Sequence, residues 1–146
     1  MRMTSPRCAP LSALACVLAF AAAPALAAGP VTLKATLAGP EEVPPAPAAG
    51  HGTASVTVDT AKGQLCYTLT AAGSDTPTMA HVHKGATGVA GPVVVPLDAP
   101  AKGSSKGCAA APADALAAII ADPAGYYVNV HTAAWPKGAM RGQLHK

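Results

Sequence analysis

Short runs of β-type residues separated by turn signals recur along most of this chain, and this pattern restricts its fold more than any other feature of the sequence. Residues 31–37 alternate apolar side chains with threonine and lysine, as expected for a half-buried strand. Residues 54–59 and 64–70 flank the connection 60–63, whose final glycine favours a hairpin turn. About seven short strands predict an all-β sandwich or barrel. The remaining strands are expected at residues 79–84, 93–98, 126–132 and 139–144.

The segments between these strands are predicted from their composition. Residues 39–52 contain several prolines, which cannot donate to a strand ladder, so a loop is expected there. Residues 99–107, which are rich in small and basic side chains, are also expected to form a loop. One short helix is predicted at residues 113–121, because a leucine and two isoleucines recur there at i, i+3 and i+4.

The first 27 residues have the three-part build of a secretory signal peptide. Arginines form its positive start, residues 11–23 its apolar stretch, and Ala25-Leu26-Ala27 its small-residue cleavage site. Cleavage after Ala27 is therefore expected, which leaves one domain over residues 28–146 in the periplasm or outside the cell. The alternatives are weaker, because the apolar stretch is short for a membrane anchor and the residues before Cys16 depart from a lipoprotein signal.

Removal of the signal peptide would leave Cys66 and Cys108 as the remaining cysteines. In an oxidising compartment these two thiols are expected to form a disulfide rather than a metal site. The chain-entropy model assigns such a bridge about 4 kcal/mol as an upper figure. This contribution matters because the expected mature chain contains no phenylalanine, and its large apolar residues are mostly valine and leucine.

Charge and motifs argue against several classes of function. The formal net charge is only +3, and two of the basic residues belong to the signal peptide, whereas a nucleic-acid surface needs clustered lysine and arginine. Ser104 and Ser105 have no histidine placed beside them, and Glu41 and Glu42 are the only adjacent acidic residues. The sequence therefore contains few residues suited to general acid–base catalysis. A non-enzymatic module without membrane association is favoured.

Histidines supply the candidate chemistry. His81 and His83 occupy alternate positions of one expected strand, so both project from the same face as Met79. His131 lies in another expected strand and would add a third imidazole if the two strands were neighbours. Imidazoles with a thioether nearby suit copper better than calcium or magnesium. The alternative is a polar network in which these histidines only form hydrogen bonds. Two further histidines are interpreted as surface residues: His51 and His145.

Four sequence blocks carry a family pattern: Glu42-Val43-Pro44-Pro45, Ala80-His81-Val82-His83-Lys84-Gly85, residues 123–132 and residues 136–144. In this order they resemble the chordin-type, or CHRD, domain in its bacterial secreted form, over nearly all of residues 31–144. The resemblance implies an all-β, immunoglobulin-like Greek-key sandwich. The chain is also similar, more weakly, to the copper-zinc superoxide dismutase sandwich, in which a His-Val-His strand and a later Val-His supply copper ligands. The zinc loop of that family is not recognisable here.

Supporting roles follow for the residues around the proposed ligands. Tyr127 and Asn129 share a face with His131 and are expected to orient it, since ligating imidazoles usually donate their other N–H to a fixed acceptor. Arg141 is interpreted as a structural donor that ties the 39–52 loop, with a fixed cation of the site as the alternative. The complete candidate set is His81, His83 and His131 as metal ligands, with Met79 or Met140 as soft neighbours and Tyr127, Asn129 and Arg141 as supports.

Three hypotheses of function remain open at this point. The first is an exported binding module, for copper or for a surface partner. The second is a copper redox enzyme of the dismutase type, and the third is a purely structural domain. Their shared test is whether the three imidazoles lie together.

Overall fold

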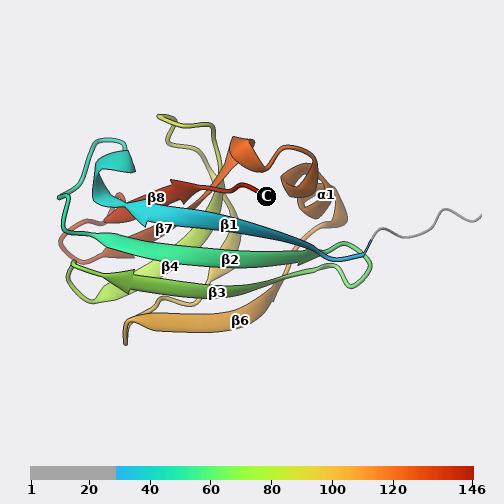
Figure 1. Cartoon of the computed structure of the whole chain (residues 1–146), viewed down its shortest axis with the longest axis horizontal. Coiled ribbons are helices and arrows are strands. Elements are labelled where there is room, and N and C mark those ends of the chain that lie inside the picture. The colour runs from blue at the N-terminus through green and yellow to red at the C-terminus, as the bar shows by residue number, and fades with distance from the viewer. Residues whose placement is uncertain (1–28) are drawn as a thin grey trace, which may run out of the picture.

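The computed structural model describes residues 29–146, and the predicted signal peptide lies outside this part of the chain. Within it the chain is all-β, with eight antiparallel strands and one short α-helix (Figure 1). The elements are β1 (Val31–Ala38), η1 (Gly39–Glu41), β2 (His51–Asp59), β3 (Gln64–Ala72), β4 (Pro77–Lys84), β5 (Val93–Leu97), β6 (Ser104–Ala110), α1 (Ala113–Ala121), η2 (Pro123–Gly125), β7 (Tyr126–Thr132) and β8 (Met140–Gln143). Among these residues no helix combines the length and apolar character needed to cross a bilayer.

The strands form one sheet in the order β5-β4-β7-β8-β1-β2-β3-β6, which folds over on itself. Figure 1 shows β1, β2, β3 and β6 in the front layer, with β4 and β7 behind them. The two edges of the sheet approach each other, because the Asp98 amide donates to the Tyr67 hydroxyl and Ser105 Oγ donates to the Asp98 carbonyl, each at 2.7 Å. The predicted all-β sandwich is therefore confirmed, with eight strands in a nearly closed sheet.

Most strands lie where the alternation of residues predicts them. The 60–63 connection closes the β2–β3 hairpin, in which Asp59 pairs with Gln64. Gly63 has φ of 63°, a backbone conformation that glycine adopts without a steric penalty. Helix α1 has the predicted bounds, and Leu116 and Ile119 are fully buried against the strands.

The prediction of a loop over residues 99–107 is wrong at its second half, because β6 begins at Ser104. This strand pairs with β3 along its whole length, from Thr70↔Ser104 to Gln64↔Ala110. Its residues are small or polar and its side chains alternate only between exposed and half-buried, so it lacks the apolar periodicity that identifies a strand in sequence. Tertiary pairing at the sheet edge creates this strand.

The predicted disulfide is confirmed. Cys66 and Cys108 are direct partners in the β3–β6 ladder, and their sulfur atoms are joined by a bond of 2.05 Å. The bridge fastens the edge strand β6 to the front layer. Few large side chains of β6 enter the core, so the covalent link compensates for weak packing.

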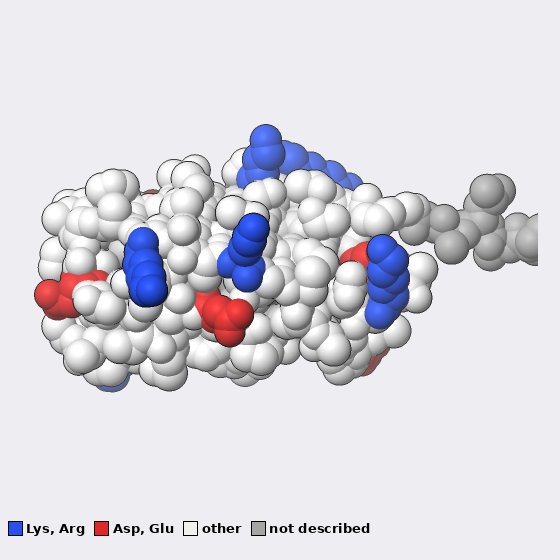
Figure 2. All heavy atoms as spheres, turned by 90° about the horizontal axis from the view of Figure 1, so that it is seen from below, with Lys and Arg blue, Asp and Glu red and all other residues white. Residues whose placement is uncertain are grey.

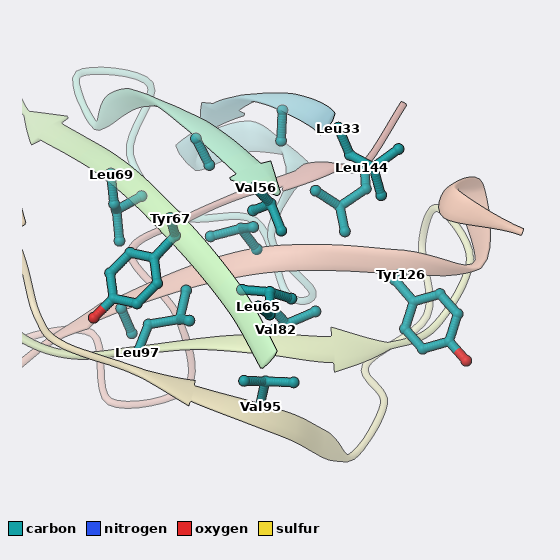
Figure 3. Packing of buried hydrophobic residues seen from close by; sticks show 14 of the residues in the cluster. Leu33, Val56, Leu65, Tyr67, Leu69, Val82, Val95, Leu97, Tyr126 and Leu144 are labelled. Atoms are coloured by element: carbon teal, nitrogen blue, oxygen red, sulfur yellow. The ribbon is translucent and has the colours of Figure 1, made fainter. Parts of the chain in front are cut away.

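The hydrophobic core lies between the layers and is built mainly from leucine and valine (Figure 3). Tyr126, Val128 and Val130 of β7 face this core, as their alternation predicts. The opposite face of β7 is buried too, although its side chains include an asparagine and a histidine. Loops cover that second face, and a loop carbonyl, that of Pro136, forms a hydrogen bond with His131. This arrangement creates the candidate site.

Charged side chains contribute little to the outer surface. On the face shown in Figure 2, a few lysine and acidic side chains lie on a mostly uncharged surface.

Candidate metal centre

The candidate site lies on the face of β4, β7 and β8 that is turned away from the core. β4 pairs antiparallel with β7, and β7 pairs with β8, so their side chains form cross-strand rows on this face. The rows pair Met79 with His131, then His81 with Asn129 and Arg141, then His83 with Tyr127 and Gln143.

This register brings the three predicted histidines together. The ring centroids are 5.1 Å apart for His81 and His131, 5.5 Å for His81 and His83, and 6.0 Å for His83 and His131. Each ring offers one nitrogen, and the three nitrogens lie within 4.8 Å of one another. The expectation that these imidazoles cluster is therefore confirmed.

The spacing is close to that needed for one metal ion. His81 Nδ1 and His131 Nε2 are 3.2 Å apart, which corresponds to an angle of about 100° at a metal with bonds of roughly 2.0–2.1 Å. Two ligands of one such ion can be at most about 4.1 Å apart. That limit holds only for ligands on opposite sides of the ion. At tetrahedral angles two ligands lie about 3.3–3.4 Å apart, so the widest pair of nitrogens, which is within 4.8 Å, must close by up to about 1.5 Å through side-chain rotation.

Backbone carbonyls orient two of the rings. His83 Nδ1 lies 2.9 Å from the Gly91 carbonyl oxygen, and His131 Nδ1 lies 3.2 Å from that of Pro136. A carbonyl oxygen can only accept a hydrogen bond, so in both rings Nδ1 carries the proton and Nε2 carries a lone pair. Both Nε2 atoms thereby carry a lone pair, the form that binds a metal ion; that of His131 accepts a hydrogen bond from His81 Nδ1, and that of His83 has no partner among the described residues.

The burial of these rings keeps them neutral. Burial lowers the pKa of His81, His83 and His131 below the ordinary value of 6.5. Neighbouring imidazoles lower the pKa of His81 and His131 further, and the Arg141 guanidinium lowers those of His83 and His131. Hydrogen bonds to the two carbonyls oppose these effects only in part. Lone pairs are therefore available at neutral pH.

A stack of three side chains holds His83 from the other side. The Tyr127 ring lies parallel to the His83 imidazole, with centroids 4.9 Å apart, and the Arg141 guanidinium carbon lies 4.3 Å from the Tyr127 centroid. The Tyr127 hydroxyl also accepts a hydrogen bond from the Gly91 amide. Sequence reasoning assigned Tyr127 to His131, whereas in the structure Tyr127 contacts His83, and the Pro136 carbonyl binds His131.

Glu42 is an important site residue that the search for candidate residues missed. It is 3% exposed, and its Oε2 accepts a hydrogen bond from Arg141 Nε at 2.7 Å. Burial raises the pKa of the Glu42 carboxyl, and the ion pair with Arg141 opposes that rise. Asn129 Nδ2 also approaches the same oxygen, at 3.5 Å. The sequence signals for Glu42 were its place in the first of the four family blocks and its position as an acidic residue inside a proline-rich loop.

Arg141 connects two loops that cover the site. Besides Glu42 in the first loop, it donates through an Nη atom to the Val89 carbonyl oxygen in the loop between β4 and β5. Arg141 as a whole is 3% exposed. Gly138 allows this packing, because a Cβ atom there would lie 2.4 Å from a Glu42 carboxylate oxygen.

The two methionines have different locations. Met79 is 46% exposed and shares the face of the imidazoles. Met140 is fully buried in the core opposite Val130, on the other face of the sheet, so it lies away from the site. His51 and His145 are exposed, as predicted.

Unsatisfied polar atoms gather at this site. Among the described residues, the buried side-chain atoms without a hydrogen-bond partner are Glu42 Oε1, His83 Nε2 and Asn129 Oδ1. All three are acceptors, and a buried acceptor without a partner is costly. The chemistry that would satisfy His83 Nε2 is a cation or a hydrogen-bond donor. A metal ion fits this requirement.

The rim of the site is apolar. Val93 of β5 is the ladder partner of His83, and Trp135 directly precedes the Pro136 whose carbonyl binds His131. The exposed large hydrophobic side chains of residues 29–146 are Met79, Val89, Val93 and Trp135, and each belongs to a strand or loop of the site.

Together, the fold and the cluster define a small disulfide-bonded β-sandwich module with a partly buried three-imidazole site on one face. The family model of the CHRD domain matches residues 33–144, and the chain therefore belongs to the CHRD domain family. The resemblance seen in the sequence blocks is confirmed. No curated protein and no solved structure matches the chain.

Proposed function

We propose that this chain is an exported binding module that holds a copper ion with His81, His83 and His131. The observation that carries the proposal is the convergence of the three rings, in which the buried Nε2 of His83 has no partner among the described residues. Two of the rings are oriented by backbone carbonyls, so the ligand face is built before a metal arrives.

Copper is favoured over other ions by the donor set. The cluster contains imidazoles only, and the nearest buried carboxylate, that of Glu42, is bound to Arg141. Calcium and magnesium prefer oxygen ligands, whereas imidazole suits zinc, copper, iron and nickel. For nitrogen ligands the affinity order among divalent ions peaks at copper.

Binding is favoured over turnover as the role of this site. A dismutase-like reaction would need a cation that attracts superoxide from solvent. Arg141 is the candidate for that role, but it is buried and ion-paired with Glu42. The positive charge is therefore neutralised and unavailable at the surface. Superoxide turnover by the copper-loaded protein tests this distinction, and no turnover above that of free copper is expected.

Export is part of the proposal. The Cys66–Cys108 disulfide supports an oxidising compartment, and CHRD family membership agrees with it. The signal peptide predicted over residues 1–27 would direct the chain there. Mass spectrometry of the protein recovered after expression should give an N-terminus at Ala28. An N-terminus at Met1 in the exported fraction would contradict this part of the proposal.

Titration with Cu(II) and Cu(I) tests the ligands. The wild-type protein should bind one equivalent, and the His81→Ala, His83→Ala double variant should lose at least about tenfold in affinity. The matched control is His51→Ala, His145→Ala, which removes two exposed imidazoles and should keep wild-type affinity. Equal affinities in all three proteins would reject the site.

A further inference from the structure

Met79 adds a different kind of donor to the imidazole face. It is the ladder partner of His131 and lies two residues before His81 on the same strand. Ala80 and Val82 are core residues, so the intervening Met79, His81 and His83 side chains project to the opposite face. The thioether therefore belongs to the imidazole side of β4.

Exposure is graded across this face. His83 and His131 are buried, His81 is half-buried, and Met79 is the outermost residue at 46% exposed. The side of the cluster nearest Met79 is thus the side open to solvent. The unbranched Met79 side chain is flexible, so its thioether can adapt its position on this face.

The cluster supplies no negative charge to a bound ion. The ligand set consists of three imidazoles, and no carboxylate in the described part of the chain joins their cluster. The nearby Arg141 cation stacks on Tyr127, which in turn stacks on His83. Glu42 neutralises this guanidinium, so the choice of ion depends on the donor atoms of the site.

We propose that the physiological form of the bound metal is Cu(I), with the Met79 thioether as its fourth ligand on the solvent side. This inference rests on the proposed function, since it requires the three imidazoles to hold copper. Thioether sulfur is a soft ligand that selects Cu(I) over harder divalent ions. Met79 thus determines the oxidation state that the site prefers, and it is the first ligand that an incoming ion meets.

The experiment compares Met79→Leu with Met140→Leu, because each variant removes one thioether and keeps an apolar side chain. Cu(I) affinity is measured by competition with a chromogenic Cu(I) chelator, and Zn(II) and Cu(II) are titrated in parallel. Met79→Leu should weaken Cu(I) binding about tenfold or more and change Zn(II) and Cu(II) binding less than about twofold. Met140→Leu should leave all three affinities unchanged, since Met140 lies in the core.

A second measurement reports contact directly. In protein labelled at the methionine methyl groups, addition of Ag(I), a redox-inert analogue of Cu(I), should shift the NMR signal lost in Met79→Leu and leave that of Met140 in place. Wild-type Cu(I) binding with no effect of Met79→Leu and no shift would overturn the Met79 assignment while leaving the imidazole site intact. Absence of copper binding by the wild-type protein would instead reject the proposed function and this inference together.

Discussion

Replacement of Arg141 by methionine tests whether one buried ion pair organises the loops over the imidazole face. Arg141 Nε lies 2.7 Å from Glu42 Oε2, and both residues are 3% exposed. Methionine fills much of the same volume but supplies no charge and no donor. The Glu42 carboxylate would then be buried without its cation, and the Val89 carbonyl would lose its donor.

The expected cost is large because one partner of a buried pair is removed. Such changes destabilise proteins by about 3–5 kcal/mol, since the remaining charge has no compensation. For a domain of this size that loss lowers Tm by roughly 10–20 °C. The cost should also depend on pH. Burial already raises the pKa of Glu42, and loss of Arg141 should raise it further.

The sign of that pH dependence follows from proton binding. With its pKa raised in the folded state, Glu42 binds a proton that the unfolded chain has released. Stability therefore falls as pH rises above the unfolded value of about 4.5 and through the folded pKa. The variant should lose more stability at about pH 8 than at about pH 5.

Urea unfolding of four proteins measures these effects: wild type, Arg141→Met, Glu42→Gln and the double variant. The double variant should be less destabilised than the sum of the single variants, because it leaves no unpaired charge. If Arg141→Met does not fold, the double variant still gives a measurable free energy of unfolding. A loss below about 1 kcal/mol in Arg141→Met, or equal losses at both pH values, would refute the reasoning.

Three further predictions concern the disulfide, the imidazoles and one glycine. Replacement of Cys66 and Cys108 by alanine should lower the free energy of unfolding, measured in urea, by up to about 4 kcal/mol. A loss below about 1 kcal/mol would contradict a stabilising role of the disulfide. Because burial lowers the pKa of the three clustered imidazoles, the unfolded chain binds more protons below about pH 6.5, so metal-free protein should lose stability from about pH 7.5 to 5.5. Replacement of these imidazoles by glutamine should flatten that pH dependence. An unchanged slope of stability against pH would contradict the role of the imidazoles. Gly138→Ala should cost more than about 2 kcal/mol, because its Cβ would meet the Glu42 carboxylate at 2.4 Å and the residue has φ of 140°. Gly88→Ala, with positive φ but open space, should cost only about 1–2 kcal/mol, and equal losses in thermal unfolding would disprove the contact.

Much of the fold could be predicted because local patterns report burial directly. Alternation along 31–37 identified β1, and the glycine at position 63 identified the β2–β3 turn. Strand β6 could not be predicted, since its small side chains carry no apolar period and its pairing partner lies more than 30 residues earlier. Such a strand forms because it pairs with a neighbouring strand, here β3.

Part of the site could also be predicted from local patterns in the sequence. The period of a strand places His81, His83 and Met79 on one face without reference to any other residue. Which strand lies beside β4 is a long-range property, and only the β4–β7 register brings His131 into the cluster. Tyr127 shares a face with His131 in sequence, yet ladder pairing sets it against His83.

Local sequence patterns were sufficient for the all-β class, the disulfide partners, the family and the side of β4 that carries imidazoles, because each depends on local period, residue type or motif. Other features appear only in the folded domain: loops bury this polar face, Glu42 neutralises Arg141 from about 100 residues away, and Met140 faces the core while Met79 faces the site. These features depend on which segments meet in space. Such contacts arise from packing over the whole domain, and no local window of sequence contains them.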